Sequence, residues 1–301
     1  MGRWSALPSR SAVVLLDVGG SPAAWAFAAA WALSAAVLVA TGIGFPVQAA
    51  LVGLAALILG VLTVLLTEPA PRVPATASER PRLWLRLGII GAFVLLTAVS
   101  GLAFHGVIEP GAVPIWSGLV QALRDAGDAW FGSGLYLSNP VLYFVAPLAL
   151  LLLAGARLAE LGLGRGHRVG RITVLWAALP LAILGVALVS GNLSPARLVD
   201  RLVGHFFQNG FFEEFLFRGA LQSTIRRLTG PAWALVLQAV VFGAWHLGLG
   251  FTNTDNVGLL PALASVIAYQ SMIGLAFGVL YERTRNLVAP SVTHILLNSA
   301  G

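Results

Sequence analysis

Two adjacent carboxylates stand in an apolar stretch of the chain. In the segment NGFFEEFLFRGALQ, residues 209–222, Glu213 and Glu214 follow two phenylalanines, and Arg218 lies four residues beyond Glu214. Residues four apart share one face of a helix, so Glu214 and Arg218 can pair. Glu213 is rotated by about 100° from Glu214, because a helix has about 3.6 residues per turn. We therefore predict separate tasks, with Glu214 held by the arginine and Glu213 free to react.

Two histidines and an asparagine follow in later apolar segments. His246 ends the run FGAWH, and Phe242 lies one turn before it. His294 and Asn298 are four apart in the run HILLN, so they share a helix face. Each histidine alone is consistent with a packed, hydrogen-bonded residue. Together with the two glutamates, these side chains form a set that can move protons and stabilise an oxyanion.

The composition indicates the solvent around these segments. Of 301 residues, 58% are hydrophobic and 10% are charged, and the mean hydropathy is +0.87. Soluble domains carry roughly 25% charged residues. Because the apolar runs are long and unbroken rather than alternating, we predict an all-α, polytopic transmembrane helical bundle. Ionisable residues inside a membrane are costly and usually functional, although a buried ion pair that fixes helix packing is the alternative.

The elements that must position these residues are membrane-spanning helices. A hydrocarbon core takes roughly 20 helical residues, which predicts about nine spans, with eight as the alternative. The predicted spans lie near 22–43, 47–67, 84–104, 139–156, 172–190, 204–225, 231–249, 259–281 and 286–301. The sixth, seventh and ninth spans hold nearly all of the polar residues. Gly274 and Gly278 in the eighth span form a G-x-x-x-G step, which predicts close helix packing.

The loops differ in their charge. The formal net charge of +6 comes from arginine alone, because the chain has no lysine. Arginines occur in segments 68–86 and 157–171 and at 226–227 and 283–285, which alternation of the spans places on one side. By the positive-inside rule that side is cytoplasmic and so is the N-terminus. Membrane orientation and lipid headgroups explain the basic excess, so we expect no nucleic-acid partner.

Two loops suggest how the chain is divided. Segment 68–82, EPAPRVPATASERPR, is rich in proline and alanine and is predicted to be a flexible linker. Segment 113–130 has Ile115, Trp116, Leu119, Val120 and Leu123 on one face and is predicted to be an amphipathic helix on the outer membrane surface. We expect 1–135 to be a variable N-terminal membrane region with about three spans and this outer helix, and 136–301 to be the core.

The polar residues of the late spans form three motifs in a fixed order. This order resembles the CPBP intramembrane protease family, which includes type II CAAX prenyl endopeptidases and bacteriocin-processing or abortive-infection relatives. The resemblance covers residues 200–301, is weaker over 140–200 and is absent over 1–135. The motifs are EEFLFR (213–218), FGAWH (242–246) and HILLN (294–298).

The resemblance implies a role for each matched residue. Glu213 is expected to be the general base that activates a water, with His246 as its proton partner or as a second contact to that water. His294 and Asn298 are expected to stabilise the oxyanion of the tetrahedral intermediate. These roles are physically consistent, since a water attacking a peptide carbonyl needs a base and an oxyanion needs preplaced donors.

The same resemblance implies a role for Glu214 and Arg218 and indicates whether a cofactor is needed. Glu214 and Arg218 are expected to support the site structurally, and the family implies a mechanism without metal or other cofactor. The alternative is a zinc site in which Glu213, His246 and His294 are the ligands. The chain has no H-E-x-x-H motif of the kind that zinc proteases carry.

The sequence therefore predicts an intramembrane endopeptidase that uses a glutamate-activated water on lipidated or small peptide substrates. Its expected partners are a peptide or protein substrate and membrane lipids. The alternatives are a proton-coupled transporter and a non-catalytic membrane scaffold with the same residues. Transport requires a continuous path of polar residues through the bilayer, and the first five spans offer few polar residues for such a path. The arginine-only, Ala- and Gly-rich composition favours a prokaryotic plasma membrane.

Overall fold

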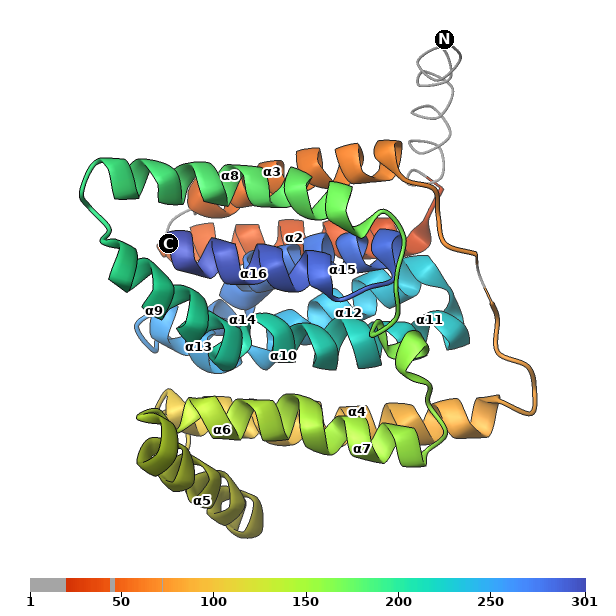
Figure 1. The fold of residues 1–301 in the computed structure, drawn as a ribbon, viewed down its shortest axis with the longest axis horizontal. Coiled ribbons are helices and arrows are strands. Elements are labelled where there is room, and N and C mark those ends of the chain that lie inside the picture. Colours follow the sequence, from red (N-terminus) through yellow and green to blue (C-terminus); the bar gives the residue numbers. More distant parts are fainter. Residues whose placement is uncertain (1–19, 44–46, 72) are drawn as a thin grey trace.

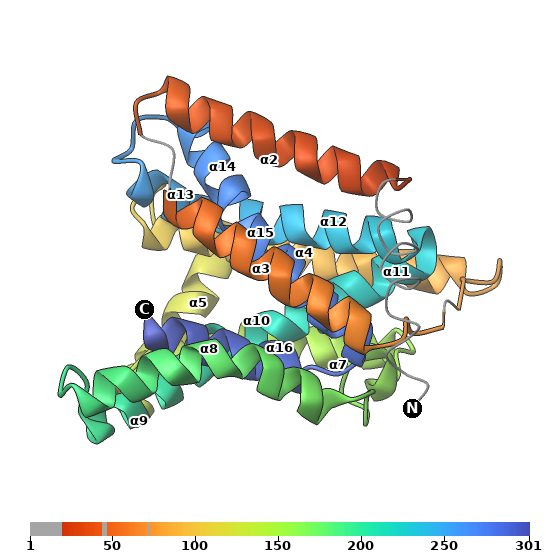
Figure 2. The ribbon, with the colours of Figure 1, turned by 90° about the horizontal axis from the view of Figure 1, so that it is seen from above.

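The computed structural model describes residues 20–43, 47–71 and 73–301, so the first 19 residues of the predicted N-terminal region lie outside it. All regular structure in this part of the chain is helical. Most of the helices lie along the length of an elongated bundle, and α5 crosses one end of it (Figures 1 and 2). The structure thus confirms an all-α bundle.

The described residues of the first half of the chain form α-helices, one π-helical segment and one 3-10 turn. They are α2 (Pro22–Ala40), α3 (Val47–Leu66), α4 (Arg80–Phe104), α5 (Pro114–Phe131), α6 (Leu135–Pro140), the π-helix η1 (Val141–Val145), α7 (Ala146–Leu153), the 3-10 turn η2 (Leu158–Leu161) and α8 (Val169–Val189).

The second half begins with one nearly continuous helix that widens twice into a π-helix. Its elements are α9 (Pro195–His205), the π-helix η3 (Phe206–Gly210), α10 (Phe211–Glu214), the π-helix η4 (Phe215–Gln222), α11 (Ser223–Thr229), α12 (Pro231–Trp245), α13 (Leu247–Asn253), α14 (Leu259–Ala268), α15 (Gln270–Thr284) and α16 (Val288–Ala300).

Long apolar helices with exposed apolar side chains make this an integral membrane protein. Within the described residues, five helices are long and apolar enough to cross a membrane, and the pair α12 and α13, bent by 57°, is a sixth if it forms one span. Leu95, Leu153 and Val189 on three of them are 65%, 84% and 93% exposed. Lipid solvates such side chains without the cost that water imposes. The count of nine spans stays a prediction.

The helix that carries the glutamates is capped at its start and widened on both sides of them. The Ser194 hydroxyl accepts a hydrogen bond from the backbone N–H of Arg197 at 3.2 Å, and Pro195 occupies the first helical turn. The π-helices η3 and η4 lie directly before and after α10. Widened turns of this kind often occur at functional sites, because they change the direction in which side chains point.

Small residues let α15 approach the helices around it. A Cβ atom on Gly274 would lie 3.0 Å from Cδ1 of Phe242, and one on Gly278 would collide with Nε2 of Gln238. The carbonyl of Gly274 accepts hydrogen bonds from Arg218 Nη2 at 3.2 Å and from Gln238 Nε2 at 2.9 Å. The predicted close packing at the G-x-x-x-G step is therefore confirmed, and it supplies a backbone partner for the buried arginine.

The proline-rich segment after α3 is attached to α11. Nη2 of Arg226 donates to the carbonyls of Ala70 at 3.0 Å and Pro71 at 3.2 Å. Nη2 of Arg227 lies 2.7 Å from Oε1 of Glu79. The segment therefore differs from the flexible linker that its composition predicted, because two arginines distant in sequence hold it. It lies with the other arginine-bearing turns at one end of the bundle, on the right in Figure 1.

The predicted outer amphipathic helix exists as α5, but its apolar face is divided. Ile115 is 92% exposed, whereas Val120 is 7% exposed. Trp116 turns toward α4, where its Nε1 donates to the hydroxyl of Ser100 at 2.8 Å. One part of the face thus packs against protein and the rest remains exposed. α5 therefore belongs to the wall of the bundle rather than lying apart from it.

Candidate functional site

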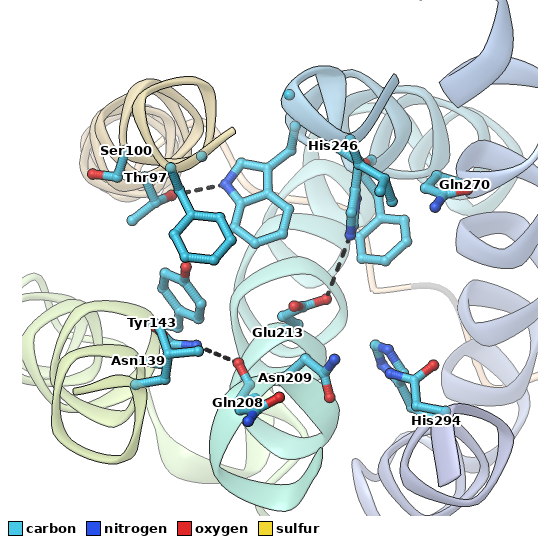
Figure 3. Close-up of a pocket in the computed structure, with 18 of the residues that line it drawn as sticks. Thr97, Ser100, Asn139, Tyr143, Gln208, Asn209, Glu213, His246, Gln270 and His294 are labelled. Atoms are coloured by element: carbon cyan, nitrogen blue, oxygen red, sulfur yellow. Dashed lines mark hydrogen bonds and ion pairs between the residues drawn. The ribbon is translucent and has the colours of Figure 1, made fainter. Parts of the chain in front are cut away.

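One cavity inside the bundle collects the four residues predicted to be catalytic. Its volume is about 400 Å³, and Glu213, His246, His294 and Asn298 all line it. They come from α10, from the junction of α12 with α13, and from α16. Figure 3 shows Glu213, His246 and His294 directed toward the same space. The tertiary structure thus brings together residues that the sequence places on three separate helices.

Glu213 and His246 face each other without a direct hydrogen bond. Oε2 of Glu213 lies 4.0 Å from Nε2 of His246, beyond normal hydrogen-bond length. This oxygen is buried and has no hydrogen-bond partner in the described structure. On the other side of the imidazole, Nδ1 lies 2.9 Å from the carbonyl oxygen of Phe242. Because a carbonyl can only accept, Nδ1 carries a proton, and Nε2 of the neutral ring offers a lone pair to the cavity.

The end of α12 explains why His246 reaches the cavity. The helix ends at Trp245, His246 is its C-cap, and α13 continues at 57° to it. The residue at such a bend points out of the helix instead of packing along its side. Nε1 of Trp245 donates to Oγ1 of Thr97 on α4 at 2.9 Å, and the Trp245 and His246 rings contact each other edge to face at 4.8 Å. The bend is thus supported by a helix of the N-terminal region.

Glu214 lies between two cationic or potentially cationic partners. Its Oε1 accepts from Nη1 of Arg218 at 3.0 Å and lies 2.9 Å from Nδ1 of His294. The side chains of Glu214 and Arg218 are both 0% exposed. The guanidinium also lies 4.3 Å from the ring centroid of Phe242 and 5.4 Å from that of Phe277. The predicted pair of Glu214 with Arg218 is present, and pairing is what makes two buried charges tolerable.

The contact between Glu214 and His294 was not predicted. The sequence offers no indication of it, because the two residues are 80 positions apart and lie on different helices. It orients the imidazole so that one nitrogen is held by the carboxylate. His294 therefore depends on Glu214 for its position in the cavity wall.

Other polar residues of the cavity were also missed. Asn139 and Tyr143, from α6 and η1, line it beside Glu213 (Figure 3). The Asn139 amide donates to the carbonyl of Gln208 inside η3. Asn139 precedes a proline in an apolar run, and that unusual polar position was the available signal. Thr97 on α4 lines the cavity as well, so the N-terminal region contributes to the site.

The arrangement offers no ready-made ligand set for zinc. Within the residues that the structure describes, no group of three or more His, Asp or Glu side chains could hold a metal ion. Structural and catalytic zinc sites need at least three converging protein ligands. A mechanism without a cofactor stays a prediction.

The fold and the cavity define an integral membrane protein with a carboxylate, histidines and asparagines around one internal space. Residues 195–300 match the family described as type II CAAX prenyl endopeptidase, Rce1-like. The match covers about a third of the chain and includes all three motifs. It confirms the predicted family for this part of the chain, and that family implies a peptidase. No curated protein and no solved structure matches the chain.

Proposed function

We propose that the protein is an intramembrane endopeptidase that hydrolyses peptide bonds with a water activated by Glu213. The observation that carries this proposal is the unpartnered Oε2 of Glu213, 4.0 Å from Nε2 of His246 in the cavity wall. Both atoms are acceptors, so a single water can donate one hydrogen bond to each. The oxygen of that water then has a lone pair free to attack a carbonyl.

The residues of the cavity can serve each step of the attack of water on the peptide bond. Glu213 takes a proton as the water oxygen bonds to the peptide carbon, and it returns this proton to the leaving amine. The carbonyl oxygen becomes an oxyanion, which Asn298 and His294 stabilise from the opposite wall. Since Nδ1 of His294 donates to Glu214, Nε2 can donate to the oxyanion only when the ring carries two protons. An ionised Glu214 stabilises that imidazolium.

We propose the following setting for this reaction. The chain spans a prokaryotic plasma membrane about nine times with its N-terminus in the cytoplasm, because the arginine-bearing turns gather at one end of the bundle. Residues 136–301 form the core, and 1–135 form an N-terminal region that adds to the wall of the site. Lipidated proteins and small peptides are the substrate classes, and the surrounding lipids are partners of the exposed helices.

The decisive experiment compares wild-type protein with Glu213→Gln and His246→Ala in cleavage of a peptide library, followed by mass spectrometry. Loss of the base lowers the rate by about 10²–10⁴-fold. Glu68→Gln, which changes an exposed carboxylate, is the matched control and retains activity. If Glu213→Gln cleaves the peptides as fast as wild-type protein does, Glu213 is not the base. Inactivation by a chelator, reversed by zinc, replaces the metal-free mechanism with the zinc alternative.

The same variants separate the alternatives. A proton-coupled transporter moves protons across vesicles without cutting any peptide. A scaffold whose glutamate only fixes packing loses thermal stability in Glu213→Gln and has no activity to lose. An endopeptidase retains its melting temperature in that variant and loses cleavage alone.

A further inference from the structure

α5 brings one arginine to the wall of the catalytic cavity. Arg124 lines both the cavity of about 400 Å³ that holds Glu213 and a second cavity of about 200 Å³ between α4 and α5. Its Nε is buried without a hydrogen-bond partner, and no carboxylate of the described residues pairs with its guanidinium. An unpaired guanidinium in the wall of a cavity is suited to binding an anion such as a carboxylate.

The acidic residues near this arginine along the chain are engaged elsewhere. Oδ1 of Asp125 accepts from Nε2 of Gln121 at 2.7 Å. Oδ1 of Asp128 accepts from the backbone N–H of Gly134 at 2.6 Å. Glu109 lines the smaller cavity but not the larger one. Within the described residues, therefore, no ion pair neutralises the guanidinium that faces the larger cavity.

The arginine is held at both of its ends. A Cβ atom on Gly134 would lie 2.9 Å from Cα of Arg124, and one on Gly127 would lie 2.9 Å from Cα of Gly134. The backbones at α5 and at the start of α6 are thus in direct contact at the Cα atom of Arg124. At the guanidinium end, Cζ of Arg124 lies 5.4 Å from the ring centroid of Phe104. A side chain restrained in this way loses less conformational entropy on binding than a free surface arginine.

Arg124 is the cation of the cavity wall that has no carboxylate partner, whereas His294 is held by Glu214. Among the lining residues, Glu213 is the sole carboxylate and Arg124 the sole guanidinium. His105, just beyond α4, also lines the cavity, but burial lowers its pKa and keeps it neutral at pH 7. The reacting carboxylate and the free cation come from different helices, α10 and α5.

We propose that Arg124 binds a carboxylate of the substrate while the peptide bond to be cut lies at Glu213. The proposal rests on the endopeptidase function proposed above. A guanidinium offers two parallel N–H donors that match the two oxygens of a carboxylate, and partial burial strengthens the pair. The carboxylate can be the C-terminal end of the peptide or an acidic side chain. Arg124 would thereby determine where along a peptide the cut falls.

The test measures binding without cleavage. Glu213→Gln protein in lipid nanodiscs is titrated with three fluorescent peptides: dansyl-Ala-Leu-Ile-Ala with a free C-terminal carboxylate, the same peptide as its C-terminal amide, and an amide in which aspartate replaces the last alanine. The free acid binds roughly 10-fold tighter than the first amide, which corresponds to about 1.4 kcal/mol. If the aspartyl amide binds as tightly as the acid, an acidic side chain also serves; if it binds like the plain amide, the chain end is specific.

The second set of variants assigns the preference to the arginine. Added to Glu213→Gln, Arg124→Gln abolishes the preference for the acid, and Arg124→Lys retains part of it. Arg197→Gln, at an exposed position of α9 outside both cavities, keeps the full preference. Equal affinity for all three peptides in protein that contains Arg124 overturns the proposal, as does a preference that survives Arg124→Gln.

Failure of this inference is distinguishable from failure of the proposed function. Wild-type protein that cleaves acid and amide peptides with the same KM is an endopeptidase in which Arg124 has no such role. Protein that cleaves none of the peptides but binds the acid through Arg124 has the carboxylate site without the proposed activity.

Discussion

His294 Nδ1 lies 2.9 Å from Glu214 Oε1, and the same oxygen is 3.0 Å from Nη1 of Arg218. The chain of contacts links a fully buried arginine to a histidine in the wall of the cavity. It shows that the second glutamate of the pair has two partners instead of one. The carboxylate can neutralise the guanidinium and still hold an imidazole in a fixed orientation.

This relationship predicts a large kinetic effect for Glu214→Gln. The amide cannot support a doubly protonated His294, so an oxyanion donor is lost and kcat falls by about 10²–10³-fold. KM changes little, because Glu214 does not line the cavity. The measurement is steady-state cleavage at a temperature well below unfolding.

The same substitution also leaves Arg218 buried without its counter-charge, which costs about 3–5 kcal/mol. The double variant Glu214→Gln/Arg218→Met removes both charges and separates the effects: it recovers stability but not kcat. Full activity in a folded Glu214→Gln protein contradicts the role given to His294.

A second prediction concerns the support that α4 provides. Thr97→Val removes the hydrogen bond from Trp245 Nε1 and leaves that partly buried group unsatisfied, at a cost of about 1–3 kcal/mol. Because the Trp245 ring contacts His246, the catalytic efficiency falls together with stability. Thr63→Val removes a comparable bond from Trp176 Nε1, away from both cavities, and serves as the control. Equal losses of kcat/KM in both variants show that the Thr97 bond supports the fold in general and not the histidine.

A third prediction tests the close contact around α15. Gly278→Ala places a Cβ atom against Gln238 and lowers the free energy of unfolding by about 1–3 kcal/mol, as overpacking does. Gly88→Ala is the matched control, because a Cβ atom there meets nothing within 4 Å. That change is neutral or stabilises α4 by up to about 1 kcal/mol. Thermal unfolding in detergent compares the two, and equal melting temperatures contradict the packing argument.

A fourth prediction is a pH dependence of the segment that precedes α4. The ion pair with Arg227 and hydrogen bonds from Thr76 lower the pKa of Glu79 from 4.5 to about 2. A lowered pKa in the folded state means that the attachment is fully present above pH 4.5 and is lost as the pH falls toward 2. Since the chain has no cysteine, a spin label on Ala77→Cys reports this segment alone.

The spin label should be immobile at pH 7 and gain mobility between pH 4.5 and 2. In Glu79→Gln the label should be mobile over the whole range, because the ion pair with Arg227 is absent. A label whose mobility is the same in both proteins at pH 7 shows that Glu79 does not hold the segment.

The sequence by itself determined the features that depend on local spacing. Long apolar runs predicted an all-α membrane bundle, since the bilayer core leaves helices as the structures that satisfy their own backbone. The spacing of four residues predicted the pair of Glu214 with Arg218, and Gly274 with Gly278 predicted close packing. These predictions succeeded because each depends on one helix and its period.

Only the tertiary structure decided which helices face one another. The contact of Glu214 with His294, the place of Asn139 beside Glu213, and the free guanidinium of Arg124 all join elements distant in the chain. Such contacts depend on the angles between helices, on the bend after Trp245 and on the widened turns around α10. A periodic pattern specifies which side of a helix is polar, but not which neighbour that side meets.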